Sequence, residues 1–157
     1  MFIRLLKAHR VQRVVDVRTI PRSRHNPQFN RDELSPALHG AKIHYSHMPG
    51  LGGLRRPRPD SANTGWRNAS FRGFADYMQT AAFEDSLERC IDLAKQERVV
   101  LMCAEAVPWR CHRSLIADAL LARGINAREI TSRIRTQPHA LTPFARIKDT
   151  HVTYPGR

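Results

Sequence analysis

Apolar residues follow strand-like spacing in four parts of the chain. Valine-rich runs occur at Arg13–Val17 and Val99–Cys103, and polar and apolar residues alternate over Lys42–Met48. Short β-branched runs are typical of buried strands, and alternation is typical of strands with one exposed face. We therefore expect three strands here. Asn126–Thr131 predicts a fourth strand at an edge of the same sheet.

Helical spacing separates these strands. Gly124 and Gly40 are placed to end helices. Strands that alternate with helices predict an α/β fold, here a three-layer domain with a mainly parallel sheet and helices on both faces. Val99–Cys103 is expected to be the central strand, buried on both faces. The expected helical segments are 2–8, 30–40, 71–78, 83–95 and 111–124.

Two segments lack such periodicity. Pro49–Ser70 is rich in glycine, proline and arginine, which predicts a long basic loop at about 49–70. Loops of this length are usually functional or disordered. Residues 135–157 contain three prolines and predict an extended tail packed on a single domain formed by residues 1–134.

Composition narrows the range of functions. The 157 residues contain 26 Lys+Arg against 14 Asp+Glu, a formal net charge of +12, so an anionic small molecule or a nucleic acid is the expected partner. The odd number of cysteines (three) and the lack of a secretory leader argue against a disulfide scaffold. No apolar run approaches the ~20 residues of a membrane span. We expect a reduced, cytoplasmic protein that does not enter a membrane.

Reactive side chains gather where the strand Val99–Cys103 leads into the next helix. The amino end of a helix has unpaired N–H groups and partial positive charge, which stabilise an anion or a thiolate. We therefore expect a cysteine-dependent enzyme site for a phosphorylated or nucleotide-like substrate, at the carboxyl end of the sheet. The candidate catalytic residues are Cys103, Glu105 and His112. The candidate substrate-binding residues are Asp16, Arg18, Arg22, Arg24, Arg110, Arg113 and Ser114.

Three other interpretations remain open. Cys103 could be a buried structural cysteine, and Asp16 with Arg18 a structural ion pair. No cofactor is expected, but Cys103, Cys111 and His112 are an alternative metal-ligand set. Against it, the ligand spacing is unusual, and Cys111 and His112 would diverge on a helix. The third interpretation is a nucleic-acid-binding module without catalysis, which would use the arginines at 22, 24 and 55–58.

Long, ordered motifs carry a resemblance to one family. They are Asp16-Val17-Arg18 with the nearby PRSRHNPQFN, LGG at Leu51–Gly53, GWRNASFRGFADYM at Gly65–Met78 and CAEAVPWRCHRS at Cys103–Ser114. Together they closely resemble the uncharacterised family catalogued as domain of unknown function 488. Its members usually begin with a further strand carrying a Thr-Ile-Gly-His-Ser-like motif, which this sequence does not show. The resemblance implies no established activity.

A weaker likeness concerns shape alone. A cysteine after a strand and Arg113-Ser114 at the next helix resemble the phosphate-binding loop of cysteine phosphatases. The strand ending in Asp16-Val17-Arg18 resembles the start of a rhodanese domain. The spacing from Cys103 to Arg113 is longer than in the phosphatase loop, so this is an analogy.

Overall fold

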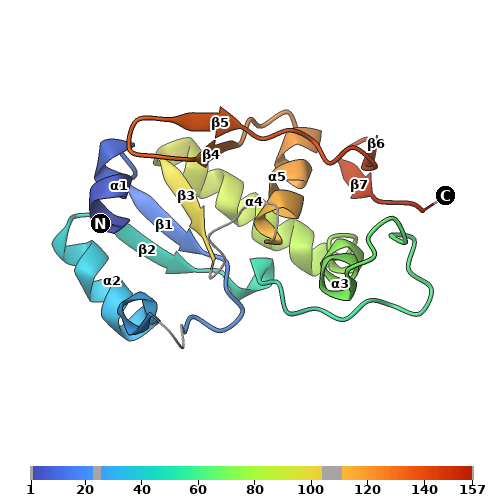
Figure 1. The fold of residues 1–157 in the computed structure, drawn as a ribbon, viewed down its shortest axis with the longest axis horizontal. Coiled ribbons are helices and arrows are strands. Elements are labelled where there is room, and N and C mark those ends of the chain that lie inside the picture. Colours follow the sequence, from blue (N-terminus) through green and yellow to red (C-terminus); the bar gives the residue numbers. More distant parts are fainter. Residues whose placement is uncertain (1, 23–25, 104–110, 157) are drawn as a thin grey trace.

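The computed structural model describes residues 2–22, 26–103 and 111–156. Its main sheet has three parallel strands in the order β2-β1-β3 (Figure 1). β1 (Arg13–Asp16) lies in the centre and pairs with β2 (His44–His47) and β3 (Val99–Met102). The predicted α/β character and the parallel pairing of these three strands are confirmed.

Helices pack against the sheet through two separate apolar clusters. One contains Val14 and Met102 with side chains of α1 (Phe2–Ala8) and α2 (Arg31–Gly40). The other contains Val15 and Leu101 with side chains of α3 (Ala69–Tyr77), α4 (Ala81–Gln96) and α5 (Arg113–Ala122). Neighbouring residues of a strand point to opposite faces, so the alternation along β1 and β3 divides the core in two.

Two expectations about the sheet are wrong. β4 (Arg128–Ile130) does not join it, because it pairs antiparallel with β5 (Thr136–Pro138) from the segment expected to be an extended tail. β3 is therefore at the sheet edge, not in the centre. Val99, Val100 and Leu101 are only half-buried, although their apolar character indicated a strand covered on both faces.

The predicted helices form, with small differences at their ends. α5 is followed by Gly124 at φ 76°, as its position predicts. After α2, in contrast, Gly40 is still helical and Lys42 takes the left-handed conformation at φ 63°.

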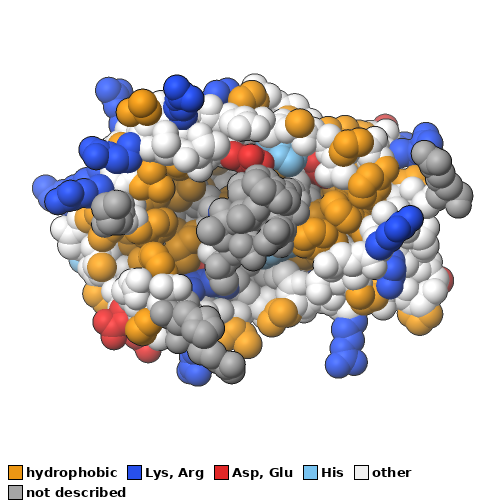
Figure 2. Space-filling view, viewed as in Figure 1, with side chains coloured by type: hydrophobic (Ala, Val, Ile, Leu, Met, Phe, Trp, Pro, Cys, Tyr) orange, Lys and Arg blue, Asp and Glu red, His pale blue; other side chains and the backbone are white. Residues whose placement is uncertain are grey.

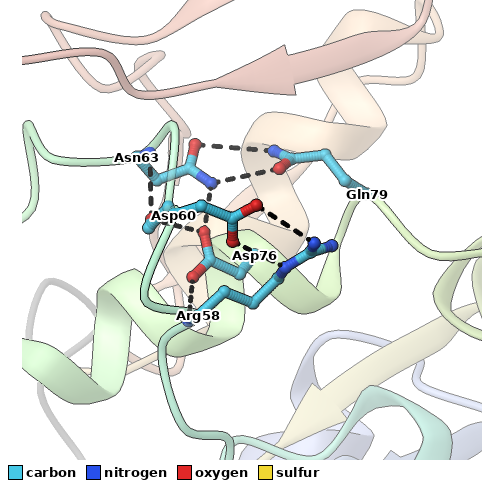
Figure 3. Close-up of polar contacts among 6 residues, drawn as sticks. Arg58, Asp60, Asn63, Asp76 and Gln79 are labelled. Carbon is cyan, nitrogen blue, oxygen red and sulfur yellow. Dashed lines mark hydrogen bonds and ion pairs between the residues drawn. The ribbon is translucent and has the colours of Figure 1, made fainter.

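The basic loop is fastened to α3 by a buried carboxylate (Figure 3). Asp76 accepts hydrogen bonds from the Ser61 hydroxyl (2.6 Å), the Asn63 amide (2.7 Å) and the Arg58 backbone N–H (2.7 Å). Burial alone would raise the pKa of Asp76, but these donors lower it below its usual value.

Two short 3-10 turns, Pro27–Phe29 and Pro49–Leu51, occur before α2 and at the start of the loop.

A second buried carboxylate holds the carboxyl-terminal segment. Asp118 of α5 accepts hydrogen bonds from His139 (2.8 Å), the Thr142 hydroxyl (2.7 Å) and the Tyr154 hydroxyl (2.8 Å). Tyr154 follows the hairpin of β6 (Arg146–Lys148) and β7 (His151–Thr153) and is fully buried. The segment after residue 135 thus contributes to the core.

No helix in the described part of the chain is long and apolar enough to cross a membrane.

Candidate functional site

The carboxyl ends of β1 and β3 lie at the same edge of the sheet. Asp16 is paired with Met102, so Cys103 follows β3 beside the end of β1. The two strand ends provide Asp16, Arg18 and Cys103, and the start of α5 provides Arg113. Adjacent parallel strands present these residues on one side of the sheet.

Asp16 and Arg18 form a buried ion pair whose hydrogen-bonding groups find partners within the protein. Arg18 donates to both carboxylate oxygens of Asp16, at 2.8 and 2.7 Å, and also to the Phe29 carbonyl at 2.7 Å. The Tyr45 hydroxyl donates to the same carboxylate at 2.5 Å. Burial opposes the charge of Arg18, but Asp16 more than offsets this and raises the Arg18 pKa. Much of the hydrogen-bonding capacity of Arg18 is therefore used within the protein.

Cys111 and His112 are brought together just before α5. The distance from Cys111 Sγ to His112 Nδ1 is 3.6 Å, and the Arg113 backbone N–H donates to the same sulfur at 3.4 Å. The expectation that the two side chains diverge is wrong, because α5 begins only at Arg113. His112 is the residue before the helix, and its ring can turn back towards Cys111.

The other ring nitrogen of His112 is held by two backbone carbonyls. Nε2 lies 3.0 Å from the Val17 oxygen and 2.9 Å from the Leu51 oxygen. A carbonyl only accepts hydrogen bonds, so we assign the proton to Nε2. Nδ1 is then free either to accept the Cys111 thiol proton or, in the imidazolium, to donate to the thiolate.

Gly53 leaves the space that this ring occupies. A Cβ atom at position 53 would lie 2.7 Å from Nδ1 of His112. The same ring packs edge-on against Phe74, with ring centroids 4.9 Å apart. The ring is thus fixed by contacts from the residue after β1, from the loop after β2 and from α3, which are distant in sequence.

Cys103 completes the cluster through its hydrogen bond to Cys111. This bond is the largest cause of a lowered Cys111 pKa, about 4, with burial opposing it and His112 and the Arg113 N–H adding to it. The sequence predicts a stabilised thiolate at Cys103, and this stays a prediction; the lowered pKa that the structure gives is that of its neighbour Cys111. All three cysteines are free thiols.

A large apolar cavity reaches this cluster. Its volume is about 890 Å³, and its lining includes Arg18, Cys103, Arg113 and Ser114. Cys111 is 4% exposed, whereas Cys103 is half-buried. Cys103 is therefore the thiol that a molecule in the cavity would meet.

One family model matches most of the chain. The model of the family described as "Domain of unknown function DUF488" matches residues 1–120. The chain belongs to the DUF488 family. No curated protein and no solved structure matches the chain. The matched DUF488 region includes the three strands of the parallel sheet and the Cys103, Cys111 and His112 cluster, whereas β4 to β7 lie beyond it.

Other predicted site residues of this DUF488 member have different surroundings. Arg22 is exposed and lines a separate hollow with Asp32 and Glu33. The Ser114 hydroxyl donates to the Cys111 carbonyl at 3.0 Å, which stabilises the first turn of α5. Arg24, Glu105 and Arg110 lie outside the described residues.

The alternative metal site is not supported by this arrangement. Across residues 2–22, 26–103 and 111–156, no group of three or more His, Cys, Asp or Glu side chains could hold a metal ion. The Nε2 atom of His112 faces two carbonyls, so only Nδ1 of this ring is placed towards the two cysteines.

Two arginines of the basic loop are used within the protein. Arg55 stacks on the Tyr77 ring at 3.7 Å and donates to backbone carbonyls, and the Arg58 guanidinium pairs with Asp60. Arg56 is exposed. Nucleic-acid binding through this loop stays a prediction.

Sequence reasoning missed three contributors to the site. Tyr45 binds Asp16, Gly53 makes room for His112, and the carbonyls of Val17 and Leu51 orient the ring. The LGG motif was the one available signal, since paired glycines often allow close approach of another group. Backbone carbonyls leave no trace in a sequence.

Proposed function

We propose that this DUF488 protein is a cysteine-dependent enzyme that acts on an anionic substrate. Cys103 is the nucleophile at the cavity, and Cys111 with His112 accepts its proton. The observation that carries the proposal is the chain of contacts from Cys103 through Cys111 to His112, whose ring is fixed by two carbonyls. A nucleophile beside a base that is itself oriented by a third group is the general pattern of nucleophilic catalysis.

The two thiols titrate as a pair. With a Cys111 pKa of about 4, the pair carries one negative charge near neutral pH, and the remaining proton is on Cys103, which donates it in a hydrogen bond to the Cys111 thiolate. When this proton moves to Cys111, the charge moves to Cys103, which lines the cavity. The Cys103 thiolate then attacks the electrophilic atom of the substrate, and the bond to the leaving group breaks.

Cationic groups beside Cys103 favour an anionic substrate. Arg18, and Arg113 at the start of α5, line the cavity together with Cys103. The whole chain carries a formal net charge of +12, which raises the local concentration of anions. A phosphorylated or nucleotide-like substrate is the class that a planar guanidinium binds well.

Site-resolved alkylation tests the nucleophile. We expect Cys103 to react with iodoacetamide near neutral pH faster than Cys90, measured by peptide mass spectrometry. Cys111→Ser removes the proton acceptor and should slow the reaction at Cys103 by about tenfold, the effect of roughly one pKa unit in the attacking thiol. Cys90→Ser is the matched control and should leave the rate at Cys103 unchanged.

The same assay tests whether an anion binds beside Cys103. Inorganic phosphate should slow alkylation of Cys103 in the wild type, and Arg113→Ala should abolish this protection. Arg22→Ala removes an exposed arginine of another hollow and should preserve it. Equal rates at Cys103 in the wild type and in Cys111→Ser would contradict the nucleophile assignment, and protection unaffected by Arg113→Ala would contradict the anion site.

A further inference from the structure

Cys103 and Cys111 are two thiols in direct contact. Their side chains are joined by a hydrogen bond, and neither sulfur is part of a disulfide in this structure. Two sulfurs at hydrogen-bonding distance need only a short approach to form an S–S bond, which is about 2 Å long. The proposed enzyme uses this contact only to move a proton, although the same contact also suits the exchange of electrons.

Contacts around Val17 hold the two cysteines in one place. The Val17 N–H donates to the Met102 carbonyl at 2.9 Å, which fixes the residue before Cys103. The Val17 carbonyl lies 3.0 Å from Nε2 of His112, and Nδ1 of the same ring lies 3.6 Å from the sulfur of Cys111. The fold therefore brings both cysteines beside the residue that follows β1, although one follows β3 and the other precedes α5.

The two sulfurs differ in a way that suits a reversible disulfide. Cys103 is half-buried, so an external disulfide can reach it, whereas Cys111 is 4% exposed and is a thiolate above a pKa of about 4. In thiol–disulfide exchange, one accessible cysteine forms a mixed disulfide and a second thiolate resolves it. A stabilised thiolate also favours the reduced pair, which makes the internal disulfide easy to reduce.

We propose that Cys103 and Cys111 are a redox-active pair, which forms a reversible disulfide by exchange with a small disulfide that carries carboxylate groups. The charge of the protein favours such an anionic reagent: the formal net charge is +12, and Figure 2 shows Lys and Arg side chains around much of one face. This inference goes beyond the proposed function, because it needs only the contact between the two thiols.

The exchange has two steps. The Cys103 proton moves to Cys111 and His112, and the Cys103 thiolate attacks one sulfur of the external disulfide, whose S–S bond breaks and releases one half as a thiolate. The Cys111 thiolate then attacks the sulfur of Cys103 and releases the second half. The two cysteines lose two electrons, and the external disulfide gains them and becomes two thiols. One proton from the cysteine pair and one from solvent complete these thiols.

Glutathione disulfide tests the proposal on the full chain at pH 7. After acid quenching and alkylation with N-ethylmaleimide, peptide mass spectrometry should find Cys103 linked to Cys111, while Cys90 remains a thiol. Dithiothreitol should restore both thiols. Glutathione that remains on Cys103 of the wild type overturns the proposal. So does a lack of oxidation at both cysteines, or a disulfide that links Cys103 of two chains.

Matched serine variants identify the resolving thiol. Cys111→Ser should stop at one glutathione on Cys103, and this adduct should persist at least tenfold longer than in the wild type. Cys90→Ser is the control and should form the same internal disulfide as the wild type. Thermal unfolding confirms that both variants fold, and the wild-type linkage decides the outcome if Cys111→Ser does not. An equally short-lived adduct in folded Cys111→Ser overturns the proposal.

Alkylation and exchange give separate answers. Alkylation of Cys103 that depends on Cys111, without an internal disulfide, overturns the redox pair and leaves the proposed enzyme in place. An internal disulfide together with alkylation that does not depend on Cys111 supports the redox pair and contradicts the proposed enzyme.

Discussion

Cys90 in α4 and Cys111 before α5 are equally buried, but the pKa values of their thiols are shifted in opposite directions. Each is 4% exposed. Burial raises the pKa of Cys90 to about 11, whereas hydrogen bonds from Cys103, His112 and the Arg113 N–H lower that of Cys111 to about 4. Desolvation alone disfavours a thiolate, and nearby donors reverse this effect. Burial by itself therefore does not mark a cysteine as structural.

The local backbone explains this difference. Cys90 lies inside a helix of 16 residues, where the backbone N–H groups bond within the helix and the surroundings are apolar. Cys111 lies just ahead of a helix, where N–H groups still need acceptors. A cysteine gains donors at that position without any change in its exposure.

The largest expected effect is that the thiols of Cys111 and Cys90 ionise at widely separated pH values. Thiolate absorbance of the wild type should rise near pH 4 and again near pH 11. Cys111→Ser should remove the acidic step and Cys90→Ser the alkaline one. An acidic step that survives in Cys111→Ser would show that the comparison assigns the thiolate to the wrong residue.

Removing the main hydrogen-bond donor to Cys111 should bring the pKa of Cys111 closer to that of Cys90. Cys103→Ala deletes the hydrogen bond to Cys111 and should raise the Cys111 pKa by more than ~1 unit, because burial then meets less opposition. Cys103→Ser keeps a donor and should cause a smaller rise. Absorbance titration of both variants measures the difference. Equal shifts in the two variants would argue against the hydrogen bond as the cause.

Displacing the His112 ring should have an intermediate effect on the Cys111 pKa. Gly53→Ala places a Cβ atom 2.7 Å from His112 Nδ1, which moves the ring and should raise the Cys111 pKa by ~1 unit. Gly40→Ala is the control, since a Cβ atom there meets nothing within 4 Å. It should leave the titration unchanged. A Cys111 pKa that is unaffected by Gly53→Ala would remove His112 from the explanation.

The smallest expected effect concerns the Arg113 side chain. The donor to Cys111 is the backbone N–H of Arg113, which alanine retains. Arg113→Ala should therefore shift the Cys111 pKa by less than ~0.5 unit, within the range of a screened surface charge. The titration used above measures it. A shift as large as that of Cys103→Ala would mean that the guanidinium, not the backbone, stabilises the thiolate.

Local patterns predicted most of the elements of this DUF488 member. The valine-rich runs, the helical spacing and Gly124 give β1, β3 and α5 almost at their observed bounds. The position of Cys103 after a strand beside Asp16 also followed from parallel pairing. Hydrophobic periodicity and turn chemistry act over a few residues, so the sequence alone carries this information.

Tertiary structure decided which neighbours each element has. β3 is an edge strand although its sequence also suits a central position, and β4 pairs with β5 although its sequence suits an edge of the main sheet. Cys111 has a lowered pKa because Cys103, which follows β3, and the Arg113 N–H at the start of α5 donate to it, while carbonyls after β1 and β2 orient His112. Strand partners and hydrogen bonds between distant segments depend on the whole packed chain, and the order of residues does not encode them locally.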